Sequence, residues 1–231
     1  MFDPKDSGSN NPQNFFDDMS KVVNREVEGF SYYSVPFGFK KDRIFYSLYQ
    51  TARAWLGSWV RGYLHPYRYA WVLAENAGLA LAKKLEKEPE PVDILCHSLG
   101  SRVVIVALKY VPEKINKVVF FNGAELVRNT ESVDGNFLNL AVLSDNVLKF
   151  LGKRFSGDKN GETVGQYGVP GWNNIFLDDA NEQAFFKERF NWDIQGDNPN
   201  SYWDHWYSYR FTGNHTLVRA FLEDNYLDFK K

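Results

Sequence analysis

Apolar residues recur every three to four positions over two long stretches of the chain, which is the spacing of amphipathic helices. Between residues 41 and 63 they fall at Phe45, Leu48, Tyr49, Ala52, Leu56, Trp59 and Tyr63. Pro66 interrupts the pattern, and a second helix is expected to follow to about Glu86, because apolar residues are again spaced by four at Leu73, Ala77, Leu81 and Leu85. Gly78 would let this second helix pack closely against a neighbour.

Continuous apolar runs, rich in β-branched and aromatic residues, predict buried strands. They are 29–35, "VDILC" at 92–96, "NKVVFFN" ending at Asn122, and "NFLNLAVLS", which runs into Asp145 and a short helix. Parallel neighbours need a crossover segment, and the crossover is usually helical. The alternation therefore predicts an α/β fold with a mostly parallel sheet and helices on both faces, and 231 residues fit one domain over 1–231.

Two segments lack a regular period. Residues 3–14 are rich in Asp, Ser, Gly, Asn and Pro and predict a long loop. Residues 152–204 mix Gly and Asn with aromatic residues and predict loops and short helices, and we expect 41–66 and 152–204 to act as lid or cap segments. The chain closes with "NHTLVRAFLEDNYL", a predicted helix with Asn214 as its N-cap.

The stretch "VDILCHSLGSRVVIVALKY" has two interpretations. Two β-branched runs joined by five residues that include a glycine are compatible with a β-hairpin. Arg102 and Lys109 are seven residues apart, so a helix places both on one solvent-facing stripe, whereas a strand would turn one of them into the core. The charges favour a strand followed by a helix.

A strand, a serine between small residues and a helix are the layout of a nucleophile elbow, G-x-S-x-G, which here reads Cys96-His97-Ser98-Leu99-Gly100. The turn is so sharp that the positions two before and two after the serine must be small. Ser98 is therefore the candidate nucleophile. The Leu99 N–H is the expected oxyanion donor, because it lies at the N-terminus of the following helix.

A serine hydroxyl needs a nearby base to become a nucleophile, and the chain has four histidines. His97 lies within the elbow and is expected to point away from the serine and to pack or bond locally, while His65 is expected to be structural or exposed. The order Ser, acid, His favours a late residue. His205 is preferred because it lies on an aromatic loop before the last helix, and His215 is the alternative, although a helix N-terminus disfavours an imidazolium there.

The acid that orients the imidazole should follow a later strand. Asp145 has that position after "LAVLS", and it is also a plausible N-cap for the helix that follows. Glu125, after "VVFFNGA", is the second candidate, and Asp204 is expected to make a local loop contact.

The composition limits the classes of partner that the protein is expected to bind and the compartment in which we expect it. Twenty-seven basic and twenty-nine acidic side chains leave a net charge of −2, which provides no basic field for nucleic acid. The single cysteine, Cys96, cannot form an internal disulfide, and no apolar run is long enough for an integral membrane segment, so we expect a cytoplasmic protein. The aromatic content of 17% exceeds the need of a core and points to a pocket or surface.

The sequence resembles the α/β-hydrolase superfamily, esterase- or lipase-like serine hydrolases, through "CHSLGS", the strand that ends at Asp145 and "DHW" before a closing helix. The resemblance implies acyl transfer by Ser98, His205 and Asp145 on a small-molecule or lipid-like ester, with no cofactor or metal. It differs at the front, where the family's N-terminal strands and the His-Gly loop that supplies a second oxyanion donor are not found. Two alternatives follow, an amidase or acyltransferase with the same triad and a non-catalytic or weakly active binding module.

Overall fold

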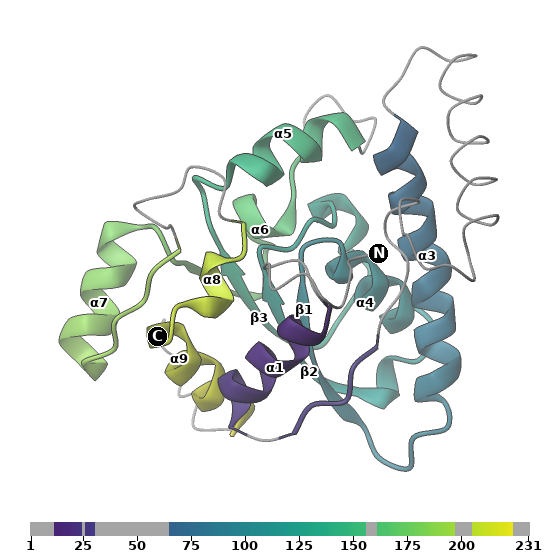
Figure 1. The fold of residues 1–231 in the computed structure, drawn as a ribbon, viewed down its shortest axis with the longest axis horizontal. Helices are drawn as coiled ribbons and strands as arrows, with labels where there is room; N and C mark the ends of the chain where they lie inside the picture. Colours follow the sequence, from purple (N-terminus) through teal and green to yellow (C-terminus); the bar gives the residue numbers. More distant parts are fainter. Residues whose placement is uncertain (1–11, 25, 31–64, 156–160, 197–204, 224–231) are drawn as a thin grey trace.

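The computed structural model describes residues 12–24, 26–30, 65–155, 161–196 and 205–223 (Figure 1). The helix predicted over 41–63, most of the strand predicted over 29–35 and most of the lid segment predicted over 41–66 lie outside these ranges. The remaining predicted elements can be compared with the structure.

A four-stranded parallel sheet forms the centre of the described chain, as the sequence predicts. Its strands lie side by side in chain order and are β1 (Val92–His97), β2 (Ile115–Phe121), β3 (Asn136–Ala141) and β4 (Asn173–Phe176). His97 pairs with Phe121, and Phe121 pairs with Leu140, so the carboxyl ends of the first three strands are nearly level. Side chains that follow these strands are therefore brought to one edge.

Both faces of the sheet are buried, and alternate residues of β2 show how. Val118 and Phe120 pack with α3 (His65–Leu85) and α4 (Gly100–Leu108). Val119 and Phe121 pack with α1 (Pro12–Val23) and α9 (Gly213–Leu222), which lie next to each other in front of the strands in Figure 1. This explains why the second half of β2, Val118 to Phe121, is apolar at every position instead of alternating.

The remaining elements of the described chain are short helices and turns that precede or follow the strands. They are α5 (Asn146–Phe155), α6 (Val164–Tyr167), α7 (Ala180–Phe190) and α8 (Tyr207–Arg210), with short 3₁₀ turns at Pro112–Lys114 and Val127–Asn129.

Three local predictions are wrong. Residues 12–14 belong to α1 instead of a loop, because proline is favourable at the first position of a helix. The segment 152–204 contains a strand, β4, as well as helices and loops. Asn214 is not the N-cap of α9, which begins at Gly213 with Thr212 in the cap position, and the Asn214 side chain bonds instead to Gln195 and Ser208.

Candidate active site

The candidate residues lie where parallel strands end. Ser98 follows β1, Asn122 follows β2 and Asp145 follows β3. In open α/β sheets the crevice beyond the carboxyl ends of the strands is the usual ligand site.

Ser98 lies at an abrupt change from strand to helix. Its φ is +52°, a left-handed conformation that is uncommon for a residue with a Cβ atom. The serine carbonyl accepts hydrogen bonds from the Ser101 N–H at 3.1 Å, the Ser101 hydroxyl at 2.7 Å and the Ala124 N–H at 2.9 Å. Residues from Gly100 onward form α4, so the β-hairpin interpretation is wrong and the strand–turn–helix is confirmed.

The small residues around the serine meet across the turn. A Cβ placed on Gly100 would lie 3.4 Å from the Cβ of Cys96, which is already van der Waals contact and leaves little room for larger side chains at both positions. Cys96 is buried, its thiol donates to the Val119 carbonyl at 3.6 Å, and burial raises its pKa. This cysteine fills space and is not a reactive thiol.

Arg102 does not lie on a solvent stripe as predicted. Its guanidinium stacks 4.5 Å from the Trp71 ring centroid and forms ion pairs with Glu75 at 2.8 Å and Glu125 at 3.0 Å. Lys109, the second charge of the pattern, is exposed and is the C-cap residue of α4, as the helix prediction requires.

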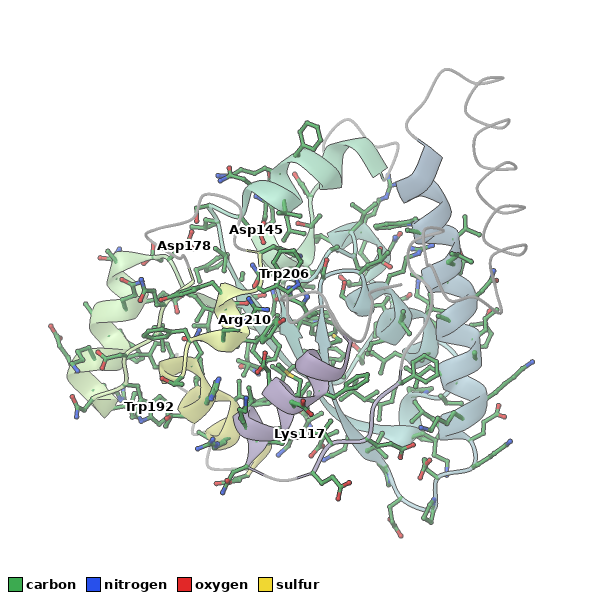
Figure 2. The ribbon with its side chains drawn as sticks, in the orientation of Figure 1. Lys117, Asp145, Asp178, Trp192, Trp206 and Arg210 are labelled. Carbon is green, nitrogen blue, oxygen red and sulfur yellow. The ribbon has the colours of Figure 1, made fainter. Side chains whose placement is uncertain are left out.

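Asp145 and His205 are brought together although they are 60 residues apart in sequence. The Asp145 Oδ2 atom lies 2.6 Å from the His205 Nδ1 atom, and both side chains are buried, with residue exposures of 6% and 4%. Asp145 also accepts the Leu148 N–H through Oδ1 at 3.0 Å, so it caps α5 while it holds the imidazole. In Figure 2 Asp145 and Trp206, the neighbour of His205, project next to each other.

This pairing determines the tautomer of His205. A carboxylate can only accept, so Nδ1 carries a proton, and the Nε2 of the neutral ring is left as a bare acceptor. That Nε2 atom is buried and has no hydrogen-bond partner, and no hydrogen bond joins it to Ser98. Burial acts to raise the pKa of Asp145, but the hydrogen bond and charge of His205, together with the Asn122 amide and the Leu148 N–H, hold it below the usual value. The carboxylate is thus ionised at neutral pH.

His97 has a position that the sequence did not predict. Its ring lies against His205, with centroids 4.5 Å apart, and its Nε2 atom is 2.9 Å from the His205 carbonyl oxygen. A carbonyl only accepts, so Nε2–H of His97 donates to it. Burial lowers the pKa of His97 to about 3, and a positive charge on His205 would lower it further, so this ring stays neutral. The expectation of a local contact is wrong, because the bond spans 108 residues of sequence.

The other candidates are placed away from this pair or occupied elsewhere. His215 in the first turn of α9 bonds through Nε2 to the Tyr209 carbonyl at 2.9 Å, and partial burial lowers its pKa. Glu125 is held by Arg102, the Leu126 N–H at 2.8 Å and the Asn129 amide at 2.8 Å. His65 begins α3, and Asp204 lies outside the described residues.

Leu99 lies immediately before α4 and is partly exposed. Its carbonyl accepts the Arg102 N–H at 3.1 Å, as expected of a residue that begins a helical turn. The N–H groups of a first helical turn have no partner within the helix, so this part of the turn can donate to an anion.

A cavity of about 370 Å³ lies next to the Asp145 backbone. It is lined by Leu143, Lys149, Gly161, Gln166 and Tyr167. The Gln166 amide is 3.4 Å from the Asp145 carbonyl oxygen, whereas Ser98, Asp145 and His205 are not among the lining residues. The wall of the cavity is partly apolar and aromatic because it includes Leu143 and Tyr167, which are both exposed.

Two further features of the described residues bear on function. No group of three or more His, Cys, Asp or Glu side chains within them is arranged to hold a metal ion. None of the helices in the described ranges has the length and apolar character needed to cross a membrane. Comparisons with protein-family models, curated proteins and solved structures found no match for this chain.

Proposed function

We propose that the protein is a serine hydrolase of carboxylic esters, in which Ser98 is the nucleophile, His205 the general base and Asp145 the residue that orients and charges the base. The Leu99 N–H is the proposed oxyanion donor. Small or lipid-like esters are the proposed substrates, with the partly apolar cavity at Leu143 and Tyr167 as a place for their non-polar part.

One observation carries this proposal, the state of the His205 ring. Its Nδ1 is bound by a buried carboxylate at 2.6 Å, and its Nε2 is buried with no partner. Leaving a buried acceptor unpaired is costly, so the unpaired Nε2 atom needs an explanation, and a catalytic role is one. An imidazole held in this tautomer is prepared to accept a proton.

The proposed reaction follows from these roles. Nε2 takes the Ser98 hydroxyl proton as Oγ bonds to the ester carbonyl carbon, and the carbonyl oxygen becomes an oxyanion near the Leu99 N–H. The tetrahedral intermediate collapses, the C–O bond to the alcohol breaks, and the imidazolium returns the proton to the leaving alcohol. Water then attacks the acyl-serine with the same base, which releases the acid and restores Ser98.

The order of the residues also supports the proposal. A left-handed serine between a strand and a helix, an acid after the strand two places further along the sheet and a histidine before the last helix resemble the α/β-hydrolase superfamily. The fold alone does not specify a reaction, so the test must address the residues.

Hydrolysis of a short-chain p-nitrophenyl ester tests the proposal. Ser98→Ala should lower kcat/KM by at least about 10³-fold, to the background rate. Ser132→Ala is the matched control, because Ser132 is exposed, and its rate should equal that of the wild type. Equal rates in wild type and Ser98→Ala would reject the hydrolase and leave a binding module.

A further inference from the structure

Asn122 follows β2 in an unusual backbone conformation. It is 2% exposed and its φ is +46°, a left-handed value that Asn tolerates better than most residues. Its N–H donates to the Leu140 carbonyl at 3.2 Å. Gly165 packs directly on it, since a Cβ placed on Gly165 would lie 2.8 Å from the Asn122 Cα. The position of its side chain is therefore fixed by the surrounding backbone.

The orientation of the Asn122 amide is set by its partners. The Nδ2 atom lies 2.6 Å from Asp145 Oδ2, and a carboxylate can only accept, so the NH₂ group faces Asp145. The amide oxygen then faces Ser208 and accepts the hydroxyl hydrogen of that residue. One side chain at the end of β2 thus joins the acid after β3 to α8, which begins two residues after His205.

A buried network extends from this amide. The Ser208 carbonyl accepts from the Asn214 amide at 2.6 Å. Asn214 in turn donates to the Gln195 carbonyl at 2.8 Å and accepts the Gln195 N–H at 3.0 Å. Buried networks in which each member has a partner restrict motion more than isolated bonds do. The segment that carries His205 is therefore tied to the same amide that holds Asp145.

We infer that Asn122 is a positioning residue, which sets the proton affinity of the Asp145–His205 pair and the orientation of its carboxylate. The amide donates to Oδ2, the same oxygen that accepts His205 Nδ1–H. It therefore draws negative charge away from the oxygen that raises the proton affinity of the imidazole. This inference rests on the proposed function for its effect on catalysis, although its effect on the pair does not depend on turnover.

Other titratable groups lie near the pair and must be kept constant in a test. His97 packs on His205 from the end of β1, and the charge of Arg210 in α8 acts on His97. The Leu148 N–H continues to hold Asp145 Oδ1 when Asn122 is changed. Loss of the amide should therefore leave the carboxylate held at Oδ1, with an Oδ2 atom that is more basic and less fixed in direction.

The test uses the full chain with Asn122→Gly, because glycine adopts a positive φ without strain. Ser208→Ala is a second variant, which removes only the hydroxyl that orients the amide. Asn139→Ala is the control, because Asn139 is also a buried amide, with bonds to the Val164 carbonyl and Asn174 and none to the pair. The measurements are the His205 pKa from ¹⁵N NMR, assigned with His205→Asn, and kcat and KM for the p-nitrophenyl ester.

In Asn122→Gly the His205 pKa should rise by about 0.5 to 1 unit, and kcat should fall by about tenfold with KM within about twofold. Ser208→Ala should show smaller changes in the same direction, and Asn139→Ala should change neither quantity. A structural role alone would move stability without moving the pKa.

An unchanged His205 pKa in both Asn122→Gly and Ser208→Ala would overturn the inference, as would an equal pKa change in Asn139→Ala. A wild type without esterase activity would reject the proposed function instead. The NMR titration would then decide alone, with a raised pKa upholding the influence of Asn122 on the pair and an unchanged pKa refuting it.

Discussion

At the scale of single residues, Ser98 combines a polar side chain with a backbone conformation that suits glycine. A residue with a Cβ in the left-handed region costs about 1 to 2 kcal/mol, and the φ of Ser98 is +52°. The Oγ atom makes no hydrogen bond to another described residue that would offset this cost. Strain of this kind is often found where function requires a particular side-chain direction.

This strain predicts a difference between two variants that both lack the hydroxyl. Ser98→Gly should be more stable than Ser98→Ala by about 1 kcal/mol, because alanine keeps the strain and glycine removes it. Urea denaturation at pH 7 measures the difference. A glycine variant less stable than the alanine variant would show that the turn is not strained.

The two late histidines differ in the partners of their Nε2 atoms. Nε2 is unpaired in His205 and bonded to the Tyr209 carbonyl in His215. His205→Asn should therefore lower kcat/KM for the p-nitrophenyl ester by about 10³-fold or more, and His215→Asn should lower it less than about threefold. The reverse order of effects would move the base to His215.

At the scale of elements, the contact between α3 and α4 depends on a glycine. A Cβ on Gly78 would lie 2.5 Å from the Val106 Cβ and 2.8 Å from the Val103 carbonyl oxygen. The two helices must move apart to admit it, and this movement disturbs the core that α4 forms with β2. The confirmed role of Gly78 in close packing was predicted from its place in the apolar pattern.

Gly78→Ala should lower the free energy of unfolding by about 1 to 3 kcal/mol, despite the better helix propensity of alanine. Asn76→Ala on the exposed face of α3 is the control and should be neutral or slightly stabilising. The change is measured by thermal or urea unfolding. Equal stability of the two variants would mean that the helices tolerate a wider separation.

The elements predicted correctly are those with long apolar patterns, such as α3 and the strands β1 to β3. β4 was missed because its four residues, NNIF, include two asparagines, which are poor strand formers. Asn174 uses its side chain on the Val169 and Trp172 carbonyls, a local arrangement that periodicity does not reveal. The whole of α1 was missed, and its first residues were predicted as a loop because proline is compatible with both a loop and a first helical position.

The residues of the candidate site also divide into those that local sequence patterns predict and those that only the folded chain brings together. Ser98 follows from the spacing of small residues, and Asp145 and His205 from their order along the chain. His97 and Asn122 act through contacts that span 108 and 23 residues, so only the folded register of β1 and β2 brings them to the pair. The sequence marks Asn122 only as a polar residue directly after a buried strand. Many residues without a positioning role share that feature, so it could not single out Asn122.

At the scale of the whole molecule, the buried histidine makes stability depend on pH. The pKa of His97 is about 3 in the folded protein against 6.5 as the ordinary value. Below pH 6.5 the unfolded chain gains a proton at this position and the folded protein does not, so stability falls by up to about 1.4 kcal/mol per pH unit. The lowered pKa of His215 acts in the same direction, whereas Asp145 contributes only below its ordinary value of 3.8.

Stability should therefore decline from pH 6.5 to pH 4, and His97→Phe should reduce the slope because phenylalanine keeps a ring but does not titrate. Urea denaturation at several pH values between 7 and 4 measures both slopes. The comparison uses slopes because the substitution also removes the bond to the His205 carbonyl and lowers stability at every pH. Parallel curves for wild type and variant would contradict the assignment of this pH dependence to His97.

The proposed chemistry of the molecule depends on one activated serine, and a fluorophosphonate probe followed by peptide mass spectrometry tests it most directly. A single adduct is expected, on Ser98, that forms in the folded wild type and is lost on heat denaturation and in His205→Asn. An absence of labelling, or an adduct on any other serine, would contradict it.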